Sequence, residues 1–136
     1  MKIINYTFAF ALLLVFVAGC GNPTVTGKVT FPDGTPLTRG EVIFESGTMQ
    51  ARGLIGEDGT YTMESGEQRG IPRGTYQVFV GGFSATVVPS NVPGGRPQVI
   101  PPTIPIARKY TSPSDSGLVV EVRGRTRFDF TVSPPE

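Results

Sequence analysis

The amino-acid sequence predicts an all-β protein, an antiparallel β-sandwich of about seven strands. Three observations favour this fold class. Glycine (18) and proline (13) are abundant. Apolar and polar residues alternate in short runs, and no run beyond the first 20 residues has the 3.6-residue period of a helix. Short alternating strands separated by turn formers are typical of packed β-sheets.

The alternation locates each strand. In the first, Thr24–Phe31, the residues Val25, Gly27, Val29 and Phe31 share one face, which indicates a half-buried strand. Further strands are expected at Glu41–Glu45, Met49–Ile55, Thr60–Met63, Thr75–Val80, Leu118–Val122 and Arg127–Val132. The side chains expected to face the core in the later strands are Tyr61, Met63, Leu118, Val120, Val122, Phe128, Phe130 and Val132.

Turn residues separate these strands. Asp33-Gly34 predicts a turn after the first strand. Asp58-Gly59 is the pair that type I′ hairpins prefer. Glu64–Gly74 is polar, with Ile71 as its apolar pin, and the polar connection Lys109–Gly117 is expected to hold one helical turn.

The segment Gly81–Ile106 is expected to be an irregular, proline-rich loop. It contains six prolines, and proline cannot donate a hydrogen bond to a β-ladder, so the segment cannot form a central strand. Ser84–Val88 is the one stretch with the composition of a short edge strand. A loop of this length in a compact domain is usually functional or disordered.

The N-terminus predicts a cleaved, helical signal peptide. Lys2 supplies a positive charge, and the apolar run Phe8–Ala18 is too short to span a bilayer as a helix. Val17-Ala18-Gly19-Cys20 resembles the lipobox of bacterial lipoproteins. That resemblance implies cleavage between Gly19 and Cys20, and lipidation of the Cys20 thiol as a diacylglyceryl, palmitate-bearing cysteine. The alternatives are an ordinary signal peptide with an incidental cysteine, or an uncleaved anchor.

Three parts follow from this interpretation. Residues 1–19 are the signal peptide, residues 20–23 a short lipidated tether, and residues 24–133 one domain. Cys20 is the only cysteine, so no disulfide partner competes for its thiol. The expected location is lipid-anchored at the cell membrane or outer membrane, facing the periplasm or the cell exterior. Gly21 after the cysteine resembles the outer-membrane sorting pattern of lipoproteins.

The charge balance excludes one class of partner. The chain has 12 lysines and arginines against 11 aspartates and glutamates, and Lys2 leaves with the signal peptide. A mature chain without net charge gives no electrostatic reason to bind nucleic acid.

Several motifs resemble carboxypeptidase regulatory-like domains, which are transthyretin-like β-sandwiches. These motifs are Val25-Thr26-Gly27-Lys28-Val29, Asp33-Gly34-Thr35-Pro36-Leu37, Asp58-Gly59-Thr60-Tyr61 and Pro72-Arg73-Gly74-Thr75-Tyr76-Gln77-Val78. The resemblance covers most of the mature chain apart from residues 81–103, and it implies an immunoglobulin-like, Greek-key topology. The matching residues are turn glycines and core aromatics, so they imply no peptidase activity.

The residue inventory argues against catalysis. The chain has no histidine, so nucleophile–histidine sites and the usual zinc sites are not expected, and neither is a cofactor. Glu57 and Asp58 together supply fewer oxygen ligands than calcium needs. A turn-forming role is favoured for Asp58. Glu41 and Glu45 are expected on a solvated face.

Two groups of residues are the candidates for a ligand or partner surface. Phe79 and Phe83 flank the start of the proline-rich loop, although a packed contact beneath the loop is the favoured interpretation of both. Arg123, Arg125 and Arg127 alternate across the last turn and, with Arg108 and Lys109, are candidates for a basic patch toward anionic lipid or an acidic polymer. Solubilising charges beside an edge strand are the favoured alternative.

The sequence therefore predicts a membrane-anchored, non-catalytic envelope lipoprotein that binds or organises an envelope protein or polysaccharide. The alternatives are a hydrolase with an unrecognised carboxylate site and an assembly accessory of an envelope complex.

Overall fold

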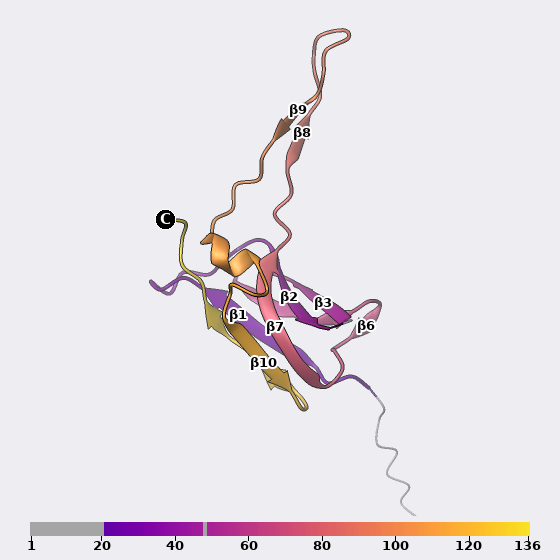
Figure 1. Ribbon diagram of the computed structural model, residues 1–136, viewed down its shortest axis with the longest axis vertical. Coiled ribbons are helices and arrows are strands. Elements are labelled where there is room, and N and C mark those ends of the chain that lie inside the picture. Colours follow the sequence, from indigo (N-terminus) through magenta and orange to yellow (C-terminus); the bar gives the residue numbers. More distant parts are fainter. Residues whose placement is uncertain (1–20, 48) are drawn as a thin grey trace, which may run out of the picture.

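The computed structural model describes residues 21–47 and 49–136, and within them it is an all-β, mostly antiparallel, sandwich-like fold (Figure 1). The predicted signal peptide, residues 1–19, and Cys20 lie outside the described residues. The described residues contain no α-helix; their one helical element is the 3-10 turn η1 (Arg108–Thr111). This turn overlaps the connection Lys109–Gly117, where a single helical turn was expected. None of the described residues form a helix long and apolar enough to cross a membrane.

Two sheets make up the sandwich. The larger sheet contains, in spatial order, β10 (Leu118–Val122), β7 (Gly74–Gly81), β2 (Glu41–Ser46), β3 (Met49–Leu54), β5 (Glu64–Ser65) and β6 (Gln68–Arg69). The smaller sheet is built around β1 (Val25–Thr30), which pairs with β4 (Thr60–Thr62), β11 (Thr126–Arg127) and β12 (Phe130–Thr131). All neighbouring strands of the larger sheet are antiparallel to each other. In the smaller sheet, β1 is antiparallel to β4 but parallel to β11 and β12.

The core lies between the two sheets, and the predicted alternation is confirmed there. The buried core side chains include Val25, Val29, Phe44, Tyr61, Met63, Tyr76, Val78, Val80, Val120, Val122, Phe130 and Val132. Ile71, the expected pin of the polar segment, is fully buried as well. Leu118 and Phe128 are only partly buried and pack against this cluster.

The hairpin turn at Gly56–Gly59 differs from the predicted type I′. That type needs positive φ at both central residues, and Gly59 has a φ of 82° while no described residue other than glycine has a positive φ. The returning strand β4 then leaves its neighbour and pairs with β1 in the opposite sheet. The turn is therefore a link between the sheets, which sequence alternation does not reveal.

The predicted last strand, Arg127–Val132, is divided into β11 and β12. At the break, the Asp129 carboxylate accepts a hydrogen bond from the Lys28 backbone N–H (2.8 Å). The Tyr61 hydroxyl donates to the Phe128 carbonyl oxygen. Side chains thus satisfy backbone groups that a continuous ladder would have paired.

Candidate functional site

A long hairpin stands out from the sandwich between β7 and η1 (Figure 1). We call residues 82–105 the arm. Its two strands, β8 (Thr86–Val88) and β9 (Gln98–Ile100), pair only with each other. The short strand expected at Ser84–Val88 is therefore present as β8, but the rest of the proline-rich segment, which was expected to be irregular, supplies a second strand and makes an antiparallel hairpin. The prolines permit it because they flank the three paired residues of each strand and do not interrupt them.

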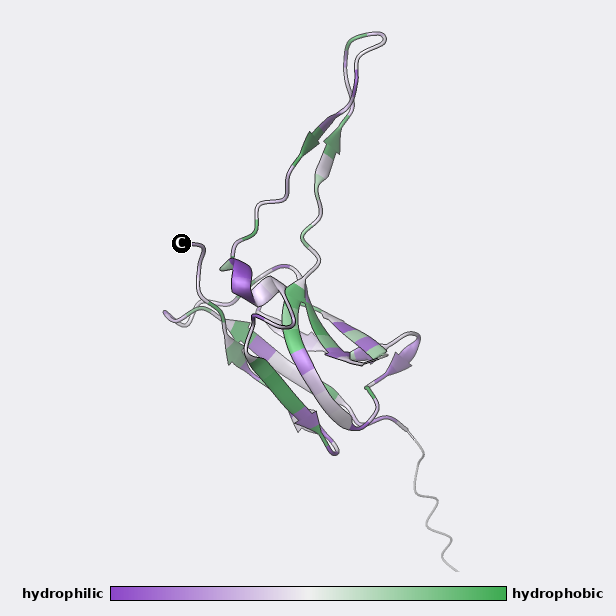
Figure 2. Cartoon of the chain, viewed as in Figure 1, coloured by the Kyte–Doolittle hydropathy of each residue, from purple (hydrophilic) through white to green (hydrophobic). Residues whose placement is uncertain are grey.

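The arm exposes apolar side chains on both of its faces. Val87 and Val99 lie opposite each other and are 60% and 65% exposed. Val88 and Ile100 lie on the other face and are exposed as well. Figure 2 shows this apolar colouring on both strands of the arm, away from the sandwich. Such exposed apolar surface usually marks a contact site.

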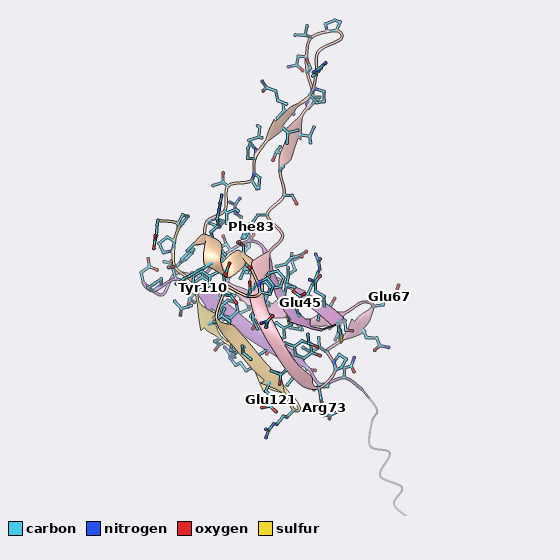
Figure 3. All side chains as sticks on the ribbon, viewed as in Figure 1. Glu45, Glu67, Arg73, Phe83, Tyr110 and Glu121 are labelled. Carbon is cyan, nitrogen blue, oxygen red and sulfur yellow. The ribbon has the colours of Figure 1, made fainter. Side chains whose placement is uncertain are left out.

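The root of the arm is held by Phe83 and Arg39 (Figure 3 labels Phe83). The Arg39 guanidinium lies 5.9 Å from the centre of the Phe83 ring, and it also donates a hydrogen bond to the Thr103 carbonyl oxygen on the returning side of the arm. These contacts tie both sides of the arm to the loop before β2. A cavity of about 220 Å³ lies at this root and is lined partly by Thr86 and Ile100.

A second, larger cavity of about 570 Å³ lies beside the returning side of the arm. Its apolar lining includes Ile104 and Ile106, and its charged lining consists of Arg108, Lys109 and Glu136. Cations and a carboxylate are mixed there, so this cavity has no single charge preference.

Of the two predicted aromatic residues, only Phe83 keeps an accessible surface. Phe79 points away from the main core and lies beside Ile43 on β2, yet it is only 9% exposed. Its ring therefore has little area to offer a ligand, which agrees with a packed contact. Phe83 is half-buried against the core cluster.

The predicted basic residues do not form one patch. Arg108 and Lys109 lie in η1, which contacts the β7 end nearest the arm. Arg123 lies at the other end of β7, because its backbone carbonyl accepts from the Arg73 Nε (2.8 Å). Figure 3 shows Arg73 and Glu121 together at this end, far along the sandwich from Phe83.

Two of the three C-terminal arginines are paired with carboxylates. Arg123 contacts Glu121 at 2.7 Å, and Arg127 contacts Asp129 at 3.0 Å. The hydrogen bond and charge of Glu121 raise the pKa of Arg123. All three arginines are exposed, so these pairs contribute little to stability. This surface has mixed charge.

Among the acidic residues, Asp58 and Asp33 act as turn formers. The Asp58 carboxylate accepts from the Thr60 hydroxyl (2.6 Å) and the Thr60 backbone N–H (3.1 Å), and these bonds lower the pKa of Asp58. Asp33 accepts the same pair of bonds from Thr35. Glu41 pairs with Arg52 at 3.2 Å. Among the described residues, no group of three or more possible metal ligands comes together.

The chain enters the sandwich at the end opposite the arm. The Pro23 carbonyl accepts from the Ile71 N–H (3.2 Å), and Thr24 accepts from the Thr126 N–H (3.0 Å). Gly21–Pro23 therefore lie beside the start of β7, whereas the arm leaves from its end at Gly81 (Figure 1). Gly19 and Cys20, predicted as the cleavage and lipidation sites, lie outside the described residues.

Comparison with known proteins shows a structural likeness alone. No protein-family model matches the chain, and no curated protein does either. The β-rich domain is structurally similar to a DUF3823 family protein from Bacteroides ovatus, with 21% identity and a TM-score of 0.47 over 83% of this chain and 45% of that one. A 9R-lipoxygenase from Cyanothece matches at 15% identity and a TM-score of 0.35, over 84% of this chain and 16% of that one. The chain spans less than half the length of either protein, and these likenesses carry no argument about its activity.

Proposed function

We propose that this protein is a membrane-anchored, non-catalytic lipoprotein of the bacterial cell envelope, whose sandwich holds a binding arm away from the membrane. The observation that carries the proposal is the placement of the arm and of Gly21 at opposite ends of the sandwich. A lipid on Cys20 would leave the arm pointing outward, toward other envelope components. We propose further, from the sequence motifs, that the sandwich is a carboxypeptidase regulatory-like domain.

The side chains of the arm favour a protein partner over a polysaccharide. Valine, isoleucine and proline dominate its exposed surface, and such side chains offer few hydrogen bonds to sugar hydroxyls. The second candidate function is therefore that of an assembly accessory for an envelope complex. Both candidates share the lipid anchor and differ in whether the partner stays bound.

The anchor is tested by replacing the thiol. In cells fed a labelled fatty acid, wild-type protein should take up label and run at the size of the cleaved form. Cys20→Ser should lose the label and stay uncleaved, because serine cannot form the thioether. Asn22→Ser, two residues away, is the matched control and should behave as wild type. Labelling of Cys20→Ser to the wild-type level would contradict the lipoprotein proposal.

The role of the arm is tested by deletion. Partners recovered from membranes with the full lipidated protein are compared with those recovered after residues 84–101 are replaced by a short glycine-serine turn. The proposal expects a specific partner that is lost in the deletion. A partner retained at the wild-type level would place the binding surface on the sandwich.

A further inference from the structure

The cavity of about 220 Å³ at the root of the arm lies in the fork where the two sides of the arm leave the sandwich, beside Phe83 (Figure 3). Three segments that are distant in sequence meet there: the loop before β2, the outgoing side of the arm and its returning side. The lining combines one cation, three hydroxyl-bearing residues and apolar side chains, among them Arg39, Ser84, Thr86, Thr103, Phe83 and Ile100. Drug-sized ligands occupy about 300–1,000 Å³, so this cavity suits a smaller ligand, of the size of one sugar residue.

Arg39 is the only charged residue in this lining. Its guanidinium donates a hydrogen bond to the Thr103 carbonyl oxygen and lies 5.9 Å from the centre of the Phe83 ring. Neither contact neutralises its charge, and a guanidinium has five N–H donors. Among the described residues, no carboxylate lies within 4.0 Å of Arg39, because the three ion pairs found there involve other arginines. Arg39 therefore keeps a positive charge and hydrogen-bond donors for a ligand.

The acidic residue at the same root, Glu41, does not compete for Arg39. A Cβ at Gly82 would lie 2.9 Å from the Glu41 Cγ, so this side chain packs against the root. Its carboxylate, however, pairs with Arg52 on β3 at 3.2 Å, and Glu41 is not part of the cavity lining. The charge inside the cavity is that of Arg39.

The cation is also held in position before any ligand arrives. The Phe83 ring that it contacts is half-buried and packs against the core cluster. A Cβ at Gly40 would lie 3.1 Å from this ring and 3.0 Å from the Gly81 carbonyl oxygen, so the loop before β2 lies close against the root. Ordering a long side chain at a binding site costs about 0.5–1.5 kcal/mol. Contacts on two sides of Arg39 reduce that cost.

The lining defines the chemistry of the ligand. One guanidinium with no second cation complements a single negative charge, which favours a carboxylate over a phosphate dianion. Ser84, Thr86 and Thr103 bring hydroxyl groups that suit a ligand with hydroxyls of its own. Phe83 and Ile100 offer apolar surface to the C–H groups of a small ring. A carboxylate, several hydroxyls and a compact ring occur together in sugar acids.

We propose that this root cavity binds a small hydroxylated carboxylate, of the class of the sugar acids, with its carboxylate on the Arg39 guanidinium. The ligand contacts both sides of the arm and the loop before β2. The site is separate from the exposed valines of β8 and β9 and does not require the lipid anchor, so it goes beyond the proposed function.

The test titrates the ¹⁵N-labelled full chain, in neutral detergent micelles, with sodium glucuronate at an ionic strength held constant with sodium chloride. Amide resonances of residues 39–40, 82–86, 100 and 103 should shift together and saturate, with a dissociation constant on the order of 1 mM. Methyl glucoside, a neutral probe with the same ring size, should bind at least about five-fold more weakly, the effect of an exposed charge pair.

Three substitutions identify the group that selects the ligand. Arg39→Gln keeps an amide donor without the charge, so it should weaken glucuronate binding by about five-fold and leave methyl glucoside binding unchanged. Arg125→Gln removes the same charge from an exposed arginine between β10 and β11, and it should change neither. Thr86→Val removes a hydroxyl and leaves the contacts of Arg39 in place, so it should weaken glucuronate binding by about three-fold.

Three results would overturn the proposal. The first is the absence of a saturating shift at these amides up to about 50 mM glucuronate. The second is equal binding of glucuronate and methyl glucoside, or an equal effect of Arg39→Gln and Arg125→Gln. The third is tighter binding of inorganic phosphate than of glucuronate, since the cavity would then select for more negative charge than one guanidinium complements.

Discussion

Gly27 is the position in the smaller sheet where adding a single methyl group should lower the free energy of unfolding most. A Cβ built there would lie 1.9 Å from the Phe128 carbonyl oxygen and 2.5 Å from the Tyr61 hydroxyl. The carbonyl belongs to backbone, which cannot rotate away, and the hydroxyl is the donor that satisfies that carbonyl. Gly27→Ala must therefore separate β1 from the break between β11 and β12.

The magnitude follows from two contributions. Overpacking a close-packed site costs about 1–3 kcal/mol, and loss of the hydrogen bond from Tyr61 to Phe128 adds about 1–3 kcal/mol. A loss of about 2–6 kcal/mol is large for a domain whose free energy of unfolding is about 5–15 kcal/mol. The melting temperature should fall by on the order of 10–20 °C.

Urea unfolding of residues 21–136, followed by circular dichroism, measures the effect. Gly27→Ala should lower the midpoint without changing the slope. Gly124→Ala is the control, because a Cβ at Gly124 has no neighbour within 4 Å. A loss below about 0.5 kcal/mol for Gly27→Ala, similar to a neutral surface change, would refute the packing argument.

Three further predictions concern other parts of the fold. Thr60→Val should raise the pKa of Asp58 toward its ordinary 3.8, and Thr62→Val is the control. The lowered pKa of Asp58 stabilises the folded state above pH 3.8, and this stabilisation is lost in acid, so the free energy of unfolding of Thr60→Val should fall less steeply between pH 5 and 2. An unchanged titration of the Asp58 carboxyl by NMR would contradict this. Burial raises the pKa of Tyr61 well above 10.0, so the free energy of unfolding should fall as the pH rises above 10. Tyr61→Phe should be less stable at pH 8, but its free energy of unfolding should change less between pH 9 and 12. An equal alkaline loss of stability in both proteins would count against this explanation. Replacing residues 84–101 by a glycine-serine turn should change the melting temperature by less than about 3 °C, because these residues are exposed throughout; a drop above 10 °C would show that the arm supports the core.

Local alternation was sufficient to predict the long strands. β1, β2, β3, β7 and β10 lie within one or two residues of their expected ranges, because each has one face against the core. Residues on the inner face were also predictable, since the period of a strand fixes which side chains share a face. Phe79 shows the limit of that reasoning, because it is buried on the outer face.

Pairing partners were not predictable in the same way. The sequence around Gly59 resembles an ordinary hairpin, yet β4 joins β1 in the other sheet. The expected short strand at Ser84–Val88 is confirmed by β8 (Thr86–Val88), but its partner β9 was missed because it is only three residues long and lies between prolines. Its register depends on contacts between residues 86–88 and 98–100, which neither strand specifies by itself.

The parallel pairing of β1 has a consequence for the order in which the protein folds. Its partners β11 and β12 lie about a hundred residues later in the chain, as the hydrogen bond from Lys28 to Asp129 illustrates. Contacts of such high sequence separation form late and slowly. The smaller sheet cannot close until β12 has been synthesised, so β1 lacks its parallel partners for as long as the chain is still emerging from the ribosome.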